Sequence, residues 1–365
     1  MTKQKNGIII AGVAIVLIAV VAGIIGFLPG TPATTVNDST GTPTASPQTE
    51  KTLRIGYLPS TGHALLFIAN EQGYFDEQRL NVELFQFQNS AEGSTAIIAK
   101  KIDVGGFGPS PLVYASKGSP VTVIGGLMAE GSGVIALPDK ADQLQDLKSF
   151  AGKTVATVRM SSGDIHFRGA IQDAGLDLQK DITIQELASP SAVLDAVKAR
   201  KVDAGVIWTP YMEMARDQGL SVIAYTSEYY PDHPCCRIAA LTENLEADRD
   251  AYVRMEKALI QAYRYSRTNP DEAVDDVLRY VTIDRDVLKT AMENPYSSIS
   301  PDPNLNGVVQ TYDLLKSIEY IETSVRIQDH VDTSVYKQAL DELASENPND
   351  PVYRQLLEDY KAMNE

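Results

Sequence analysis

Apolar and polar positions alternate in short runs along most of this chain, and the runs change period in a regular order. Residues 53–58 form a short apolar run with the period of a strand, followed by a polar turn over 59–63 and an apolar helical segment that Gly73 ends. A strand that leads through a loop into a helix is the repeating unit of α/β proteins. The helix start also presents unpaired N–H groups, which favour binding of an anion or a polar ligand.

The same alternation continues as far as residue 225 and predicts two successive α/β units. We expect strands over 82–87, 103–107, 121–127, 134–137, 153–158, 181–187, 202–207 and 222–225. We expect helices over 90–101, 109–116, 142–150, 165–174 and 190–200. A further short helix should run through Arg216, with Thr209 as its cap and Pro210 at its first position. Such an order is typical of parallel sheets covered by helices.

The last third of the chain has a different, helical pattern. A polar and aromatic loop over 227–234 leads into a strand over 237–241. Helices are then expected over 246–267, 271–280, 284–293, 305–323, 335–344 and 352–362. The α/β units are therefore followed by a helical C-terminal segment.

The N-terminal residues do not fit a globular pattern. After two lysines, residues 7–28 carry no charge, and about 20 apolar residues suffice to span a bilayer. The basic flank places the N-terminus inside and the rest of the chain on the extracytoplasmic face of the cell membrane. We favour an uncleaved transmembrane anchor over 1–28 to a cleaved signal, whose apolar run is usually ~7–15 residues long. Residues 29–50 are rich in Thr, Ser and Pro and are expected to form a tether, with a glycosylation sequon at Asn37.

Charge and motifs exclude several classes of function. The chain has 365 residues and a net charge of −16, without the clusters of Lys and Arg that nucleic-acid binding needs. It has no phosphate-binding P-loop, no nucleophile elbow, no zinc-protease motif and no Cys/His spacing typical of a metal site. We therefore predict no catalytic residue, no metal and no cofactor.

Three loops share the geometry of a ligand site, because each follows a strand and opens a helix. In open α/β sheets, ligands bind at the carboxyl ends of strands. The candidate residues in these loops are Ser60, Thr61, Gly62 and His63; Gly108, Pro109 and Ser110; and Ser161, Ser162, Gly163 and Asp164. One such loop is more often only a capped helix, but here both α/β units contribute at least one. His63 is either a donor to the ligand or an ordinary surface histidine.

Other candidates have two interpretations each. Trp208 and Tyr211 follow a strand and either line a pocket or pack at the edge of the fold. Cys235 and Cys236 are the only cysteines; they form either a strained vicinal disulfide or two buried thiols. Arg237 either binds an acidic group of the ligand or pairs with one of the many carboxylates.

Taken together, these segments resemble the solute-binding proteins of ABC importers for nitrate, sulfonate, taurine and related compounds. The resemblance covers residues 53–323. Its motifs are IGYLP at Ile55–Pro59, ANEQGYF at Ala69–Phe75, KIDVG at Lys101–Gly105, LKSFAGKTVATV at Leu147–Val158 and VDAGVIWTP at Val202–Pro210. These motifs are specific for the family and say little about the ligand.

The resemblance implies a type II periplasmic-binding-protein fold, in which two α/β lobes are joined by two crossover strands. One lobe would comprise residues 51–133 and 233–365, and the other residues 134–232. The family's ligand contacts fall on the three loops, on Trp208–Tyr211 and on Cys235–Arg237. A small ligand would close the lobes, and the closed monomer would dock on a membrane permease that works with an ATPase.

Two alternatives remain open. Fungal pyrimidine synthases of thiamine biosynthesis also look similar. They are enzymes that hold pyridoxal phosphate on a lysine and iron near a cysteine-rich run. Cys235 and Cys236 would fall in that run. The expected lysine, however, is Phe107 here, and the expected histidine is Pro111. A tethered ligand sensor is the other alternative, although the short N-terminal stub contains no signalling domain.

Overall fold

The structure is a computed structural model that describes residues 51–365. The predicted membrane anchor over 1–28, the tether over 29–50 and the sequon at Asn37 lie outside the described residues. From residue 51 onward, no helix is both long and apolar enough to span a membrane.

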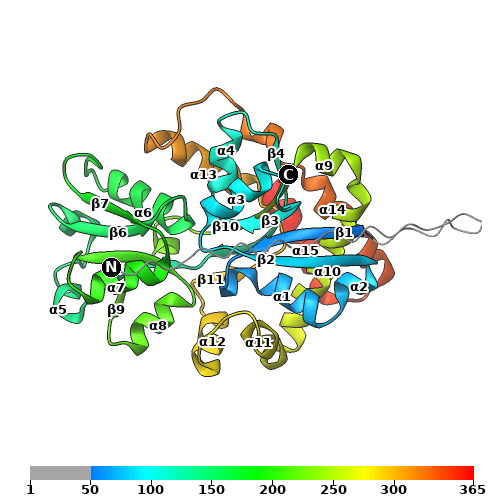
Figure 1. The fold of residues 1–365 in the computed structure, drawn as a ribbon, viewed down its shortest axis with the longest axis horizontal. Coiled ribbons are helices and arrows are strands. Elements are labelled where there is room, and N and C mark those ends of the chain that lie inside the picture. The colour runs from blue at the N-terminus through cyan, green and yellow to red at the C-terminus, as the bar shows by residue number, and fades with distance from the viewer. Residues whose placement is uncertain (1–50) are drawn as a thin grey trace, which may run out of the picture. The chain divides into compact units, whose positions relative to one another are not determined.

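The first group of strands forms a six-stranded sheet, and the elements around it are called lobe 1 here (Figure 1). Its strands, in spatial order, are β11 (Ser297–Ile299), β4 (Val121–Glu130), β10 (Pro234–Leu241), β3 (Val104–Phe107), β1 (Lys51–Tyr57) and β2 (Leu80–Gln86). β1 is parallel to β2 and β3, but β10 lies antiparallel between β3 and β4. The sheet is therefore mixed, because β10 returns to it from the other lobe and runs antiparallel to both of its neighbours.

The second group forms a five-stranded sheet in what is called lobe 2 here, drawn in green in Figure 1. Its strands, in spatial order, are β7 (Thr183–Leu187), β6 (Thr154–Val158), β8 (Ala204–Trp208), β5 (Ser132–Ala136) and β9 (Ser221–Tyr225). The chain passes from lobe 1 to lobe 2 at Gly131, between β4 and β5. Gly131 has φ +80°, and a Cβ there would lie 2.1 Å from Met128 Cε, so this crossing needs glycine.

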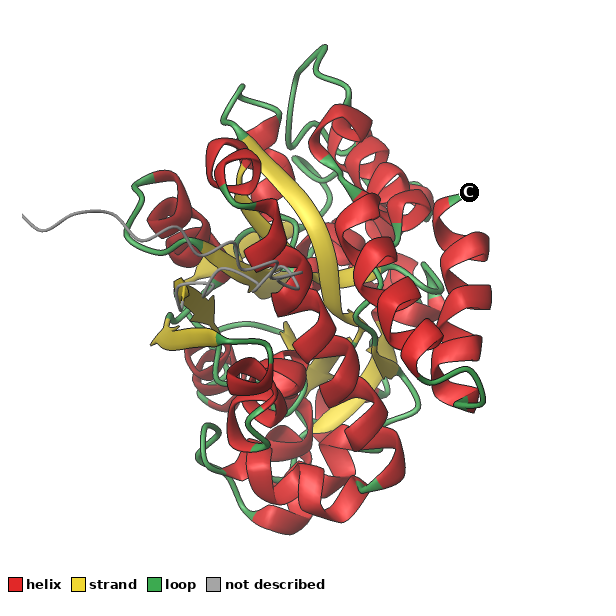
Figure 2. Cartoon of the chain, turned by 90° about the vertical axis from the view of Figure 1, so that its right-hand side faces the viewer, coloured by secondary structure: helices red, strands yellow, loops and turns green. Residues whose placement is uncertain are grey.

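Helices cover both sheets, and their apolar faces form the cores. Lobe 1 contains α1 (Ala64–Glu71), α2 (Tyr74–Glu77), α3 (Ser90–Ile98), α4 (Ser110–Ala115), α9 (Thr242–Ala247), α10 (Arg249–Thr268), α11 (Pro270–Leu278), α12 (Arg285–Met292), α13 (Leu305–Ser317), α14 (Thr333–Glu346) and α15 (Pro351–Asn364). Lobe 2 contains α5 (Pro138–Ala141), α6 (Ser162–Asp173), α7 (Pro190–Lys198) and α8 (Tyr211–Asp217). Figure 2 shows the helices of lobe 1 packed side by side, with the C-terminus at the end of one of them.

The core of lobe 1 explains why the C-terminal helices belong to it. Phe67 of α1, Tyr252 of α10 and Tyr336 of α14 are almost fully buried in one apolar cluster with β1 and β3. Helices far apart in the sequence thus complete a core that the first α/β unit cannot fill alone. A second cluster joins Met160 and Ile165 of lobe 2 to α13, so the lobes also share apolar contacts.

Several predicted elements have different bounds. Instead of the helix expected over 142–150, a loop follows α5 and leads into the 3-10 turn η2 (Leu147–Phe150). Asp146 caps this turn by accepting from the Ser149 N–H. The helix expected over 246–267 begins anew after Asp248, which caps α10. The helix expected over 305–323 ends at Ser317, and β11 and α2 were not predicted. Thr209 does not cap α8; Pro210 occupies the cap position, after a cis peptide bond.

Candidate functional site

A pocket lies between the two lobes, where strands of both sheets reach their carboxyl ends. Its cavity has a volume of only about 20 Å³, which is room for about one water molecule or a small ion. Its wall consists of Leu58, Ser60, Gly62, Ser90, Gly108, Met128, Gly131, Ser132, Ser161, Ser162, Trp208, Thr209, Cys235 and Cys236. None of these side chains is charged, so a ligand meets hydroxyls, backbone groups, apolar surface and sulfur atoms.

The first part of the wall is the loop after β1, where the 3-10 turn η1 (Thr61–His63) begins. His63 is fully buried, and its Nε2 lies 2.5 Å from the Gly106 carbonyl oxygen, which can only accept. Nε2 therefore carries the proton, and Nδ1 accepts from the Ser60 hydroxyl at 3.2 Å. Burial lowers the pKa of His63 to about 4, so the ring is neutral near pH 7. Ser60 thus faces the pocket as an acceptor, while His63 and Thr61 stand behind the wall.

The second part of the wall is the loop before α4. The Gly108 N–H donates to Ser90 Oγ at 3.1 Å, which leaves the hydroxyl proton of Ser90 free for a ligand. Ser110 is fully buried outside the pocket wall, with its Oγ 2.6 Å from Ser94 Oγ and 2.9 Å from the Ser90 carbonyl oxygen. It braces α4 against α3. Pro109 lines a smaller space next to the main pocket.

The wall from lobe 2 is built on the first turn of α6. Ser161 is the N-cap, and its Oγ accepts from the Asp164 N–H at 3.1 Å, so its own hydroxyl proton is free. The N–H groups of Ser162 and Gly163 are the first of the helix and have no partner within it. With the helix dipole, they give this side of the pocket a positive potential.

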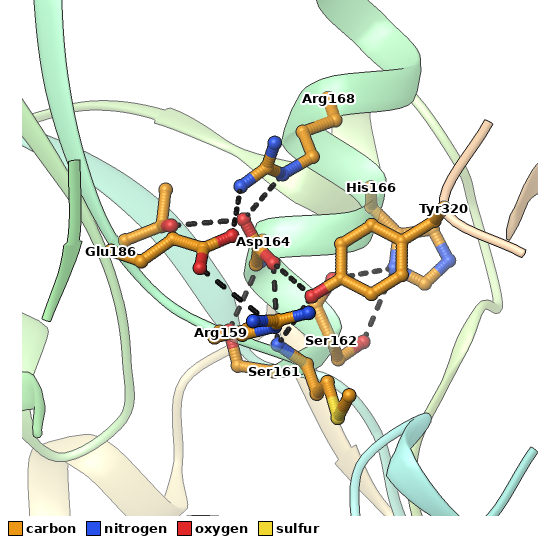
Figure 3. Close-up of polar contacts among 10 residues, drawn as sticks. Arg159, Ser161, Ser162, Asp164, His166, Arg168, Glu186 and Tyr320 are labelled. Carbon is orange, nitrogen blue, oxygen red and sulfur yellow. Dashed lines mark hydrogen bonds and ion pairs between the residues drawn. The ribbon is translucent and has the colours of Figure 1, made fainter. Parts of the chain in front are cut away.

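Asp164 does not line the pocket. It holds the start of α6 through a network of polar contacts (Figure 3). Its carboxylate accepts from Thr157 Oγ1 at 2.9 Å and from Arg168 Nε at 2.7 Å. Arg168 also donates to Glu186 at 2.9 Å. The second carboxylate oxygen accepts from the hydroxyl of Tyr320, a lobe 1 residue, at 3.4 Å. This network ties α6 to the sheet of lobe 2 and to the other lobe.

Two stacked histidines, His166 and His233, support Ser162, with ring centroids 3.8 Å apart. His166 Nδ1 donates to the Ser162 carbonyl oxygen at 2.8 Å. The Thr226 hydroxyl donates to the Ser132 carbonyl oxygen at 3.1 Å, so it accepts from His233 Nε2 at 2.9 Å. Because Nε2 of His233 carries the proton, its Nδ1 accepts from the Ser162 hydroxyl at 3.2 Å. Burial lowers the pKa of both rings, that of His166 to about 4. Ser162 thus faces the pocket as an acceptor.

The aromatic pair after β8 is divided between two roles. Trp208 lines the pocket, whereas Tyr211 meets the Trp208 ring edge to face, with centroids 6.1 Å apart, and packs within lobe 2. Thr209 also lines the pocket and donates to Glu213 at 3.1 Å. Glu213 accepts from Asn294 of lobe 1 at 2.8 Å, so this corner of the pocket also joins the lobes.

Both cysteines line the pocket as free thiols, with their Sγ atoms 3.4 Å apart. The hydrogen bond between them lowers the pKa of Cys235, and together with burial it raises the pKa of Cys236. Arg237 is buried below them and does not line this pocket. Its guanidinium donates to the backbone carbonyls of Met128 and Asp302.

Sequence reasoning missed the wall residues Leu58, Ser90, Met128, Gly131 and Ser132. Thr209 lies within the expected contact range Trp208–Tyr211 and lines the pocket. Ser132 is the most informative of the missed residues, because its Oγ is buried and has no hydrogen-bond partner among the described residues. A buried hydroxyl without a partner at a pocket wall points to a ligand. Ser132 opens strand β5 and does not follow a strand end, so the rule that located the three loops gives no signal for it.

The site is suited to bind a small polar or anionic molecule. Ser90 of lobe 1 and Ser132, Ser161 and Ser162 of lobe 2 all line it. Among the described residues, no acceptor takes the hydroxyl proton of Ser90, Ser132 or Ser161. In the part of the chain from residue 51, no three His, Cys, Asp or Glu side chains are grouped so that they could hold a metal ion.

Sequence comparison identifies relatives along most of the chain. A model described as the NMT1-like family matches residues 46–280. A protein of Bacillus subtilis named as an aliphatic sulfonates-binding protein is 28% identical over 310 residues, which cover 81% of this chain and 90% of that protein. A protein of Brucella melitensis named as a binding protein is 27% identical over 255 residues, which cover 68% of this chain and 78% of that protein.

Solved structures with the same arrangement include two periplasmic proteins. The nitrate-binding protein NrtA of Synechocystis has a TM-score of 0.71 and 15% identity, covering 82% of this chain and 92% of that chain. The aliphatic sulphonate binding protein SsuA of Escherichia coli has a TM-score of 0.67 and 19% identity, covering 78% of this chain and 92% of that chain. At such identities the likeness shows the fold, a two-sheet α/β periplasmic-binding-protein fold.

Proposed function

The chain belongs to the NMT1-like family, because the matching family model covers well over half of the sequence. From this premise we propose that the chain is the solute-binding component of an ABC importer. The names of its relatives support this function, since they include binding proteins and an aliphatic sulfonates-binding protein. Structural neighbours named for nitrate and for sulfonates support it too. It is a binding protein and not an enzyme.

The proposed ligand is a small anionic or polar organic molecule of the nitrate, sulfonate or taurine kind. The single observation that carries this proposal is a pocket without charged side chains, lined by free hydroxyls and by the start of α6. Binding proteins can hold anions through such neutral donors, because N–H groups at a helix start favour negative charge.

Lobe closure is the proposed mechanism, with lobe 1 and lobe 2 as the two bodies that move toward each other. Ser90 and Ser161 would bind the same ligand from opposite lobes, so the ligand stabilises the closed state. A Cβ at Gly108 would lie 3.3 Å from Ser162 N, which shows how closely the two loops approach. The closed monomer would then dock on the permease and ATPase of the importer at the extracytoplasmic face.

Calorimetric titration of the full chain with nitrate, alkanesulfonates, taurine, bicarbonate and pyrimidine precursors tests the ligand class. Trp208 is the only tryptophan and lines the pocket, so its fluorescence should change with the ligand that binds. Trp208→Phe should remove the fluorescence signal and keep the heat of binding. Absence of binding to every compound by the folded protein would contradict the proposal.

The pyrimidine-synthase alternative lacks its reactive groups. Phe107, at the position of the expected lysine, is fully buried in an apolar cluster, and Pro111 lies in the first turn of α4. Measuring iron and pyridoxal phosphate in the purified chain checks this directly, and finding both would revive the enzyme. The sensor alternative depends on a signalling partner, and co-purification with an importer permease would count against it.

A further inference from the structure

Three sulfur atoms share one wall of the pocket. Cys235, Cys236 and Met128 all line it, and the two thiol sulfurs lie 3.4 Å apart. A Cβ built at Gly62 would lie 3.1 Å from Met128 Sδ and 3.3 Å from Cys236 Sγ, so these two sulfurs flank one point on the opposing loop. The glycine leaves that point free of a side chain.

A β-bulge brings the two thiols to the same side. Side chains of consecutive strand residues normally point to opposite faces of a sheet. The pairing of β10 with β4 shifts register on both sides of Cys236, where Pro234 pairs with Ala129, Cys236 with Met128 and Arg237 with Gly126. Such a bulge changes the direction of a side chain and is often found beside binding sites. Here it places both thiols, and the methionine paired with one of them, in the pocket.

We propose that Cys235, Cys236 and Met128 form a binding site for a soft monovalent cation, Cu(I), within the pocket. Thiolate and thioether sulfur select Cu(I), whereas Mg²⁺ and Ca²⁺ need oxygen ligands. Zinc takes thiolate, imidazole or carboxylate ligands, and the pocket wall offers no imidazole or carboxylate. Two thiolates about 2.3 Å from one ion stand about 4.0 Å apart at the angle of about 120° that a three-ligand site has. The two thiol sulfurs, now 3.4 Å apart, would therefore have to separate by about 0.6 Å.

The charge of the occupied site can be balanced locally. Binding breaks two S–H bonds and forms two Cu–S bonds, with both protons released to the buffer and no change in oxidation state. The bis-thiolate complex of Cu(I) carries one negative charge. The buried guanidinium of Arg237, next in the sequence, is held beneath the site by the carbonyls of Met128 and Asp302. It supplies the compensating positive charge.

This site does not rest on the proposed importer function, because its donors are sulfur atoms and the anion donors are hydroxyl and N–H groups. Each can be tested without the other. Failure of the anion titration would leave Cu(I) binding standing, and failure of Cu(I) binding would leave the anion site standing.

The test is an anaerobic titration of the full chain with Cu(I) against a chromophoric Cu(I) chelator. The wild-type chain should bind one Cu(I). Cys235→Ser and Cys236→Ser should each weaken binding at least about 100-fold, and Met128→Leu should weaken it about 10-fold, as expected for a lost thiolate and a lost thioether ligand. Two variants are matched controls and should bind Cu(I) as the wild type does. Met212→Leu is the same replacement in the core of lobe 2. Ser132→Ala changes the wall of the same pocket but removes no sulfur.

Circular dichroism and urea unfolding establish that each variant is folded before its affinity is read. The site is overturned if the folded wild-type chain binds no stoichiometric Cu(I), or if the double variant Cys235→Ser/Cys236→Ser binds like the wild type. It is also overturned if Zn²⁺ displaces Cu(I) at equal concentration, because a soft-donor site must discriminate against zinc.

Discussion

At the scale of single residues, Ser60 and Ser161 look alike in the sequence, since each precedes the start of a helix. Their hydroxyl protons nevertheless have different partners. The proton of Ser60 goes to Nδ1 of a buried histidine, whereas Ser161 accepts from a backbone N–H and keeps its proton free. One serine therefore presents an acceptor to the ligand and the other a donor. The sequence predicted that both serines belong to the site, but it could not predict which of them donates its hydroxyl proton within the protein.

Ser132→Ala and Ser161→Ala should separate binding from stability. Ser132 Oγ has no partner among the described residues, so its loss should change the free energy of unfolding by less than about 0.5 kcal/mol. Its ligand affinity should fall about 5- to 10-fold, the worth of one hydrogen bond. Ser161→Ala should also lose about 1 kcal/mol of stability with its cap. Calorimetry and urea unfolding measure both quantities.

The outcome that contradicts this assignment is a Ser132→Ala variant that is destabilised as much as Ser161→Ala and still binds the ligand with unchanged affinity. The unpartnered hydroxyl would then have a structural role that the pocket geometry does not explain.

At the scale of elements, α6 connects the pocket to the rest of the fold. Its N-terminal turn forms the pocket wall, and Asp164 behind it is bound by donors from β6, from α6 itself and from lobe 1. The sequence predicted the helix and its polar start, because strand, loop and helix follow one another locally. It could not show that Asp164 faces away from the pocket, because Thr157 and Tyr320 meet it only in the folded chain.

Asp164→Asn should loosen this element. The amide cannot balance the charge of Arg168, whose side chain is mostly buried, and the free energy of unfolding should fall by about 2–3 kcal/mol. Asp313→Asn is the matched control, since Asp313 is exposed and pairs with Lys316 at 3.4 Å within α13. That variant should stay within about 0.5 kcal/mol of the wild type.

Urea unfolding at neutral pH measures the two variants side by side. Equal, small losses for both would show that the network behind α6 contributes no more than a surface ion pair.

At the scale of the whole molecule, three buried histidines support the walls of the pocket. His63 supports the loop after β1, while the stacked pair His166 and His233 supports the start of α6 and the return of the chain to lobe 1. All three are neutral near pH 7, because burial lowers their pKa values. Protonation in the folded state would place charges without partners inside the protein, so acid opposes the folded state as a whole.

Stability should therefore fall as the pH decreases from about 6.5 to about 4. In this window the unfolded histidines bind protons and the folded ones do not, so protons favour the unfolded chain. Each fully buried histidine can contribute up to about 3 kcal/mol to this loss. Urea unfolding at several pH values between 7.5 and 4.5 measures the slope.

His63→Gln provides the control for this pH dependence. The amide can still donate to the Gly106 carbonyl but does not titrate, so the variant should lose part of the slope between pH 6.5 and 4. A free energy of unfolding that stays constant across this window in the wild-type chain would contradict the assignment of neutral, buried rings.

By itself, the sequence determined most strands and helices of both lobes, β11 and α2 excepted, and the loops from which the site is built. It could do so because the spacing of apolar residues and the residues at helix starts are local properties of the chain. It also determined the family, through motifs spread over residues 53–323. Only the tertiary structure decided which side chains line the pocket. The bulge that turns both cysteines inward, the unpartnered Ser132 and the buried partners of His63 and Asp164 all depend on contacts between segments distant in the sequence. Hydrogen-bond direction and burial arise from those contacts, and no local pattern encodes them.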